Sequence, residues 1–453
     1  MPPSKPGVQV LAFLGVLLSG AAVADASRMD VVQVIDLALA QNPTMAAAAA
    51  KASAKEWELK AARQEWNPTA ALEAKTLYGS GSSTSFFAMQ GSGDPDEALI
   101  VKASGPYASL GVTLSMPLYM QGTWAYHETP KQAAASAQYD KSQLDGDTDA
   151  LALANLVFKN YLSAFEAKEE ARLYGDLANS RQKVIALVRQ KIAAQAAIGS
   201  DLVALLTAQA ATMSELRASE RKHQRELAQL RVYLGLPREA GLDMAVLPTL
   251  PSEMPKLAEI VDEALTRHPE IRAKQSEVVL STAQLKDVEQ ELGPSLSVSA
   301  SATTANGLKG GPFNTFYSVG VGLSLPLLDS GKNAAKVGAK NANLLESQQR
   351  LLMTQNDIAA QVRVAFDALL DTRDAVEAQQ QKLEQSLYEA QATRKLQQQG
   401  ASTLDQLIEQ ENAVLSNRIL LLQAHYKAWN AYADLLKSTG QIKPPVNAIR
   451  IGS

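Results

Sequence analysis

Two long segments of the chain resemble one another, and this duplication limits the folds that the chain can adopt. Residues 31–45 read VVQVIDLALAQNPTM, and residues 257–271 read LAEIVDEALTRHPEI. Three prolines match in the same order: Pro43 with Pro269, Pro68 with Pro294, and Pro117 with Pro326. The position numbers differ by 226 in the first two pairs and by 209 in the third, so one short gap in the second copy explains the change. Solenoid units run about 20–50 residues, so we interpret this much longer period as a duplicated half-molecule.

Each half reads as a helix, two strands, a very long helix, a reversal and a returning helix. We expect the following organisation: a signal peptide at 1–26; a first repeat at 27–236, with strands at about 69–78 and 108–118 and a reversal near 199; a linker at 237–256; a second repeat at 257–440, with strands at about 294–304 and 316–326 and a reversal near 400; and a C-terminal tail at 441–453.

The first residues are typical of a targeting segment. Residues 8–24 form a short apolar run that follows Lys5 and ends in Ala24-Asp25-Ala26, an A-x-A cleavage pattern. We interpret the run as a cleaved signal peptide, which places the mature chain outside the cytoplasm. The alternative is a membrane anchor, although the run is short for a bilayer core of about 30 Å.

Composition narrows the function classes further. The chain has no cysteine, so disulfides and lipidation of an N-terminal cysteine are excluded. A net charge of −4, spread along the chain, gives no footprint for nucleic acid. Aromatic residues make up only 5% of the chain, while Ala, Gln and Leu dominate, which favours long helices packed as coiled coils.

Four segments alternate apolar and polar residues with a period of two, the pattern of half-buried strands. In 317–325, Val319, Val321 and Leu323 alternate with Ser318 and Gly320. Segments of about ten residues match tilted transmembrane strands, and small polar residues suit a water-filled lumen. Loops are expected at 79–107 and 305–315. The alternative is an ordinary antiparallel sheet packed on helices.

Four strands cannot close a barrel. Unpaired backbone groups at an open edge in lipid cost several kcal/mol each. If these strands span a membrane, the barrel must therefore be shared between chains, and three chains supply twelve strands.

Two helices are longer than a globular domain needs. The first occupies 119–198, with Pro130 near its start, so the helix proper is expected to begin near Thr129. Its partner occupies 333–399. At 1.5 Å per residue, helices of about 65–70 residues span about 100 Å. Apolar residues in steps of 4 and 3, as in Ile358, Val362, Ala365 and Leu369, indicate coiled-coil packing.

The two reversals have similar chemistry. Gly199 and Gly400 suit helix ends, while Ser200, Ser402 and Thr403 suit N-caps of the next helix. Each returning helix, of about 35 residues, stops partway back. The helix expected at 31–66, or its partner at 257–292, can stack in line to complete the distance.

The ordered set of these motifs resembles the TolC-type outer-membrane efflux family over nearly the whole mature chain. The resemblance rests on LALAQNP at 37–43, EALTRHP at 263–269, MPLY at 116–119, LPLLDSG at 325–331 and the two Gly-Ser reversals. It implies a mainly α fold with membrane β-structure: a trimeric twelve-stranded barrel, four strands per chain, continued by a periplasmic helical barrel of coiled coils. It also implies an outer-membrane duct on whose helix tips a periplasmic adaptor protein and an inner-membrane pump dock.

The resemblance further implies a gate at the tips, where acidic residues narrow the lumen. On this reading Asp405 and Glu409, with Asp201 from the first reversal, line the constriction, and Gly199, Ser200, Gly400 and Ser402 form the docking tips. A spacing of four puts Asp405 and Glu409 on one helix face. The family has an arginine that locks the reversal near the position of Ser402, and this chain departs from that pattern. The alternative is that these acids are helix-start charges that the dipole favours.

Other functions fit less well. The four histidines, His127, His223, His268 and His425, stand apart in the sequence, and no nucleophile, phosphate-loop or zinc motif occurs. We therefore expect no enzyme activity, no cofactor and no metal site. The competing interpretation is a structural coiled-coil or adaptor protein of the periplasm, which explains neither the strands nor the duplication. The exported cargo, whether drug, metal ion or protein, stays open.

Overall fold

The computed structural model describes residues 28–83, 101–120, 122–193, 199–237, 240–244, 250–251, 254–307, 314–399 and 401–442. The expected signal peptide, most of the C-terminal tail and Gly400 lie outside the described residues. The chain divides into two compact units. The helical unit comprises Met1–Met45, Ala150–Glu259 and Val362–Ser453; the sheet unit comprises Ala46–Asp149 and Ile260–Gln361. Each unit takes parts from both expected repeats, so the compact units cut across the repeats.

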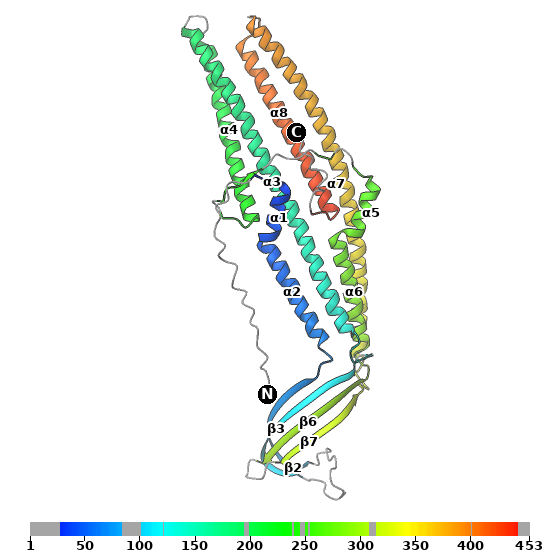
Figure 1. Cartoon of the computed structure of the whole chain (residues 1–453). Coiled ribbons are helices and arrows are strands. Elements are labelled where there is room, and N and C mark those ends of the chain that lie inside the picture. Colours follow the sequence, from blue (N-terminus) through cyan, green and yellow to red (C-terminus); the bar gives the residue numbers. More distant parts are fainter. Residues whose placement is uncertain are drawn as a thin grey trace, which may run out of the picture. The chain divides into compact units, whose positions relative to one another are not determined.

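Figure 1 shows the elements in chain order. The helices are α1 (Val31–Gln41), α2 (Pro43–Arg63), α3 (Pro130–Ala193), α4 (Gly199–Tyr233), α5 (Leu257–Arg267), α6 (Pro269–Glu289), α7 (Lys332–Gln398) and α8 (Leu404–Ser438). The strands are β1 (Arg28–Met29), β2 (Thr69–Ser83), β3 (Val101–Met120), β4 (Thr123–Trp124), β5 (Asp243–Met244), β6 (Ser295–Gly307) and β7 (Asn314–Ser324). None of the described helices is long and apolar enough to cross a bilayer.

The sheet unit is built on four long antiparallel strands in the order β2-β3-β6-β7 (Figure 1). The short β4 pairs with β3. Leu72 pairs with Val112, Leu114 with Ala300, and Val298 with Val321. The strands overlap the expected segments but run further into the hairpins. Parts of the segments expected as loops at 79–107 and 305–315 are strand, because Gly79 pairs with Gly105 and Ala305 pairs with Asn314 in the ladder.

The helices expected at 31–66 and 257–292 are each broken in two, and that prediction of single helices is wrong. Proline has no amide hydrogen and its ring clashes with the preceding turn, so Pro43 and Pro269 start new helices. Asn42 ends α1 and accepts a hydrogen bond from the Thr44 amide at 2.8 Å. His268 is the N-cap of α6 and accepts from the Glu270 amide. The residue before each of these prolines therefore has a side chain that caps the following helix.

The long helices agree closely with expectation. α3 has 64 residues and begins with Pro130 directly after Thr129, whose hydroxyl accepts from the Gln132 amide. α7 has 67 residues, and the returning helices α4 and α8 have 35 each. At 1.5 Å per residue, α3 and α7 rise about 96–100 Å along their own axes.

The core of the helical unit is a seam between α3 and α8. Val157, Phe158 and Tyr161 of α3 are buried, as are Tyr426 and Trp429 of α8. Phe158 and Trp429 meet edge to face, with centroids 6.0 Å apart. Aromatic side chains of α3 and α8 thus pack together where the two helices must be held in one register.

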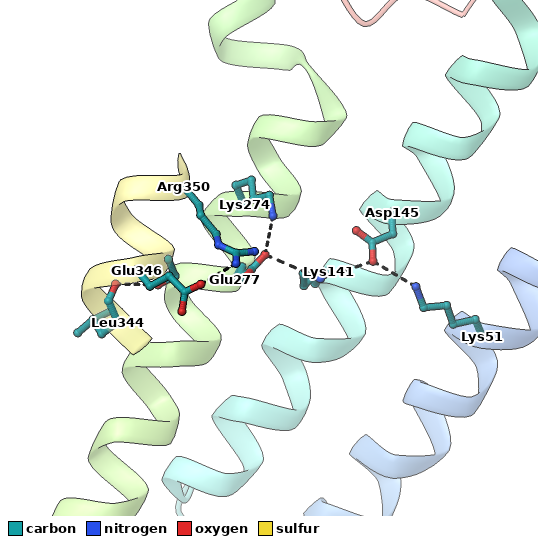
Figure 2. A network of polar contacts seen from close by, with 9 residues as sticks. Lys51, Lys141, Asp145, Lys274, Glu277, Leu344, Glu346 and Arg350 are labelled. Atoms are coloured by element: carbon teal, nitrogen blue, oxygen red, sulfur yellow. Dashed lines mark hydrogen bonds and ion pairs between the residues drawn. The ribbon is translucent and has the colours of Figure 1, made fainter. Parts of the chain in front are cut away.

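Charged side chains join three helices of the sheet unit (Figure 2). Asp145 of α3 lies 3.3 Å from Lys51 of α2 and 3.7 Å from Lys141. Lys141 in turn lies 3.9 Å from Glu277 of α6, which Lys274 approaches to 3.0 Å. Each partly exposed pair contributes only about 0.2–1 kcal/mol, so the network orders the helices more than it stabilises them.

Candidate functional site

One face of the sheet is apolar and open. The exposed fractions of Leu72, Val321 and Leu323 are 69%, 68% and 71%. Val112 and Leu114 continue this face on β3 and are also exposed. Large side chains in such numbers on one surface mark a lipid or protein contact.

The opposite face of the sheet is polar, and apart from the ion pair of Glu73 and Lys75 on β2 its described side chains are small. Ser301 and Ser318 hydrogen-bond across β6 and β7 at 2.8 Å, and Thr69 and Ser115 do so across β2 and β3 at 2.9 Å. Gly111 is buried, and a Cβ added there would meet Thr303 Oγ1 at 2.8 Å. Small residues on this face allow it to be the concave one, since larger side chains would collide.

The start of α8 is fixed by a capping box. The Thr403 hydroxyl accepts from the Gln406 amide at 3.3 Å, and the Gln406 side chain accepts from the Thr403 amide at 3.2 Å. Thr403 is therefore the N-cap, while Ser402 donates to Gln406 Oε1 from one residue earlier. Ser200 lies inside α4, whose first residue is Gly199, so the prediction of Ser200 as an N-cap is wrong.

The predicted constriction residues all lie in the first two turns of helices. Asp405 follows the first residue of α8, and Asp201 is the third residue of α4. The side chains of both lie outside the described part. Glu409 is exposed, whereas its neighbour Ile408 packs against an apolar cluster of Ile185, Val188 and Leu205 from α3 and α4. That packing turns the start of α8 so that Glu409 faces solvent.

A buried arginine next to this cluster was not anticipated from the sequence. Arg181 of α3 is 2% exposed. Its guanidinium donates to the Ala208 carbonyl of α4 at 2.9 Å, to the Thr212 hydroxyl and to Asn412 Oδ1 of α8. Burial lowers the pKa of Arg181, and the Glu411 carboxylate partly offsets this effect. One cation thus joins α3, α4 and α8.

A sequence signal for this arginine exists. Ala178, Arg181, Ile185 and Val188 follow one another in steps of 3, 4 and 3, and all four are buried. An arginine at a seam position of a coiled coil must find acceptors on the facing helices, because an unpaired buried charge is strongly unfavourable.

Next to Ser180 a cavity of about 270 Å³ opens between α3, α7 and α8. Leucines line it, among them Leu173, Leu177 and Leu387. Arg394 of α7 and Glu411 of α8 form an ion pair at 3.0 Å in its wall. The cavity therefore has a mixed lining of leucines and polar or charged side chains, close to the reversal between α7 and α8.

A second titratable group with a shifted pKa lies on α3 in the helical unit. Burial raises the pKa of the Glu166 carboxyl on α3 above its ordinary value. Lys222 of α4 and Lys427 of α8 act against this shift, while Glu170 and Glu226 add to it. His425 has a lowered pKa for the same reason, burial. These groups lie between helices, and the described residues include no cluster of three or more His, Asp or Glu side chains that could hold a metal ion.

Comparison with known proteins agrees with this architecture. The family model described as "Outer membrane efflux protein" matches residues 34–236 and 260–441. The chain is 22% identical over 338 residues to the pyoverdine export outer membrane protein OpmQ of Pseudomonas aeruginosa, covering 73% of this chain and 69% of that protein. It is 25% identical over 220 residues to the alkaline protease secretion protein AprF of the same species, covering 49% and 42%.

Solved structures share the fold. The outer-membrane channel OprN superposes with a TM-score of 0.71 at 17% identity, covering 90% of this chain and 89% of that chain. CusC superposes with a TM-score of 0.70 at 16% identity, covering 91% and 92%. The mainly helical fold is therefore that of TolC-like channels.

The structure has a sheet with an apolar face and two pairs of long helices. The family model matches residues in both halves of the chain. The chain belongs to the outer membrane efflux protein family and is a channel component of the outer membrane with a periplasmic helical part.

Proposed function

We propose that the chain is an internally duplicated subunit of a homotrimer whose twelve strands form one barrel in the outer membrane. The observation that supports this most directly is a sheet of four long strands with an exposed apolar face, in which the outer edges of β2 and β7 are unpaired among the described residues. In lipid, each unpaired backbone group costs several kcal/mol, so the edges need partners. Two further copies supply them and leave the small polar face lining the lumen.

The trimer serves as a passive duct without catalytic chemistry. It works with an inner-membrane pump and a periplasmic adaptor, which dock at the helix tips around Gly199, Ser200, Gly400 and Ser402. Relatives named for pyoverdine export and for alkaline protease secretion support both small molecules and proteins as cargo classes. The competing interpretation, a periplasmic structural or adaptor protein, has no use for the exposed apolar sheet.

The trimer is tested by chemical cross-linking in native outer membranes. Cross-linked species should increase to a trimer and no further, and heating in detergent should convert the trimer to monomer. A protein that stays monomeric in the outer membrane under every cross-linking condition would contradict the proposal.

The proposed constriction lies at the tips, where three copies bring together Asp405, Glu409 and Asp201. Carboxylates in a narrow ring attract cations and bind multivalent ones. Single-channel recording in planar bilayers should show cation selectivity and block by a trivalent cation added to the periplasmic side. Both should weaken in Asp405→Asn, Glu409→Gln, but persist in the control Glu377→Gln, Glu384→Gln, which removes two exposed charges from α7.

Unchanged selectivity and block in the Asp405→Asn, Glu409→Gln protein would mean that these acids act only as favourable charges at a helix start.

A further inference from the structure

Within the described part of the chain, the outer strands of the sheet unit, β2 and β7, lack on one side the pairing that the inner strands have on both. Inside the chain, β3 pairs with β6, and Lys141 of α3 meets Glu277 of α6. Among the described residues, the counterparts β7 and β2 are the two ends of the sheet order and are not paired with each other. We propose that neighbouring copies meet through the same contacts that the two repeats make inside one chain, so that Glu346 of one copy pairs with Lys51 of the next and Leu323 lies opposite Ala74. This inference rests on the duplication and the trimer proposed above.

The equivalence of the two halves can be read from element bounds. α1 and α5 have 11 residues each and α2 and α6 have 21 each, and in both pairs the first position numbers differ by 226. β2 begins at Thr69 and β6 at Ser295, which gives the same difference. After the sheet, Gly122 and Gly331, whose position numbers differ by 209, have positive φ angles of 76° and 80°. Equivalent positions can therefore be assigned one by one.

Along the long helices the difference becomes 205. The first residues of α4 and α8, which have 35 residues each, differ by this number in position. Gly235 and Gly440, the glycines with positive φ that follow these helices, differ by the same number. The burial pattern of α3 and α7 keeps this difference: Ser142 and Ser347, Leu153 and Ile358, and Val157 and Val362 are all buried. The longer turn before α3 accounts for the change from 209 to 205.

This equivalence predicts an ion pair between copies from one that is observed inside the chain. Inside the chain, Lys141 of α3 lies 3.9 Å from Glu277 of α6 (Figure 2). The position equivalent to Lys141 on α7 is Glu346, and the position equivalent to Glu277 on α2 is Lys51. Both signs are reversed, so the pair is again attractive. Two independent sign changes that keep the pair complementary indicate that the two positions face each other.

Exposure agrees with this assignment. The side chains of Lys141 and Glu277 are each 24% exposed, whereas those of Lys51 and Glu346 are 58% and 56% exposed. Lys51 and Glu346 have ion pairs within their own chain, with Asp145 and Arg350 respectively. A neighbouring copy would extend each of these pairs into a network like the one that surrounds Glu277.

The glycine turns give a second, uncharged comparison. A Cβ added at Gly122 would meet the Gln290 side-chain amide, just after α6, at 3.2 Å. At the equivalent Gly331 an added Cβ would meet nothing within 4 Å. The residue equivalent to Gln290 is Gln64, which is exposed. Gln64 of the neighbouring copy therefore covers the backbone at Gly331.

The strand register follows by the same transfer. β3 pairs with β6 so that Leu114 lies opposite Ala300. Shifting the first by 209 and the second by 226 places Leu323 of β7 opposite Ala74 of the next copy's β2. The transfer also places Val321 opposite Thr76. The transferred register places residues of the apolar face of β7 opposite residues of the same face of β2. A slip of one residue would reverse every side chain.

A charge swap tests the helix contact. Lys51→Glu and Glu346→Lys should each reduce the fraction of heat-resistant trimer about three- to ten-fold, because three like-charged contacts per trimer replace three attractive ones. The double variant Lys51→Glu, Glu346→Lys should recover most of the trimer. The matched control is Lys60→Glu with Glu346→Lys, since Lys60 is an exposed lysine on the same helix. No recovery in the swap, or equal recovery in the control, overturns the ion pair.

Disulfide formation tests the register, and the absence of native cysteine removes any background. Paired cysteines at Ala74 and Leu323, and separately at Lys75 and Gly322, are oxidised in native membranes. Hydrogen-bonded and non-hydrogen-bonded pairs alternate along an antiparallel ladder, so one of these two pairs has the closer geometry. Covalent trimers should form at least five-fold more from it than from the slipped controls Ala74 with Val321 and Lys75 with Gly320.

The outcomes separate this inference from the trimer itself. If a slipped pair links copies more efficiently, the barrel is closed between copies but the register is wrong. If no pair forms a disulfide while the wild-type protein is trimeric, the proposed contact is rejected and the trimer stands. If the wild-type protein is monomeric in the membrane, the proposed function fails as well.

Discussion

Arginine substitutions along β7 test whether the apolar face meets lipid. β7 has 11 residues, and Val319 is the sixth. With a rise of about 3.3 Å per residue and a tilt of about 40°, each residue advances about 2.5 Å along the membrane normal. Val319 then lies near mid-bilayer, and Leu323 lies about 10 Å away, close to the edge of an apolar band about 25 Å tall.

The expected costs follow from these depths. Val319→Arg should destabilise the folded protein by about 2–4 kcal/mol, whereas Leu323→Arg should cost about 0–1 kcal/mol. A difference of about 2 kcal/mol corresponds to roughly 30-fold in the folding equilibrium. The assay is urea titration of folding into lipid vesicles, with trimer measured at each concentration.

Gly320→Arg is the matched control on the opposite face, since an added Cβ there would meet nothing within 4 Å. It should cost far less than Val319→Arg. Equal costs at 319 and 323, or a cost at 320 as large as that at 319, would refute the assignment of the apolar face to lipid.

Three further predictions concern the helical unit. Arg181→Met should lower the free energy of unfolding by about 1–3 kcal/mol in chemical denaturation, because Asn412 loses a buried charged donor. A double-mutant cycle with Asn412→Ala should show a coupling energy above about 0.5 kcal/mol, and additive effects would mean that the two residues act separately. Burial raises the pKa of Glu166, so its ionised form is less favourable in the folded protein than in the unfolded one. Glu166→Gln should therefore raise the thermal midpoint at alkaline pH, and the gain should shrink as the pH falls toward 4.5; a gain independent of pH would contradict the assigned cause. Thr403→Ala should cost about 1 kcal/mol and speed hydrogen exchange in the first turns of α8, because it removes the capping box; unchanged exchange there would show that packing at Leu407 and Ile408 suffices.

Local periodicity was informative wherever one physical requirement dominated. The period-two segments became β2, β3, β6 and β7, and the 4-3 apolar spacing at 358–369 lies in α7. Pro130 and Thr129 correctly predicted the start of α3, since proline at the first helical position has no amide hydrogen to satisfy.

The errors arose where weak local preference competed with a stronger constraint. Gly and Ser around residue 80 predicted a loop, but ladder hydrogen bonds extend β2 to Ser83 and start β3 at Val101. One helix was expected at 31–66, through Pro43, but the missing amide and the ring clash of this proline divided it into α1 and α2. The sequence offered both Ser402 and Thr403 as N-caps of α8 and did not distinguish them. Thr403 is the N-cap because its backbone has the extended conformation that a cap needs.

The sequence by itself determined the order of the main helices and strands and the lengths of the long helices, because these depend on spacing along the chain. Only the tertiary structure decided which distant groups meet: Arg181 with Asn412, and Lys141 with Glu277. Charge and hydrogen-bond pairing between helices depends on axial register and rotation, which are set by the packing of whole helix faces. A single side chain therefore gives no sign of its partner until that packing is known.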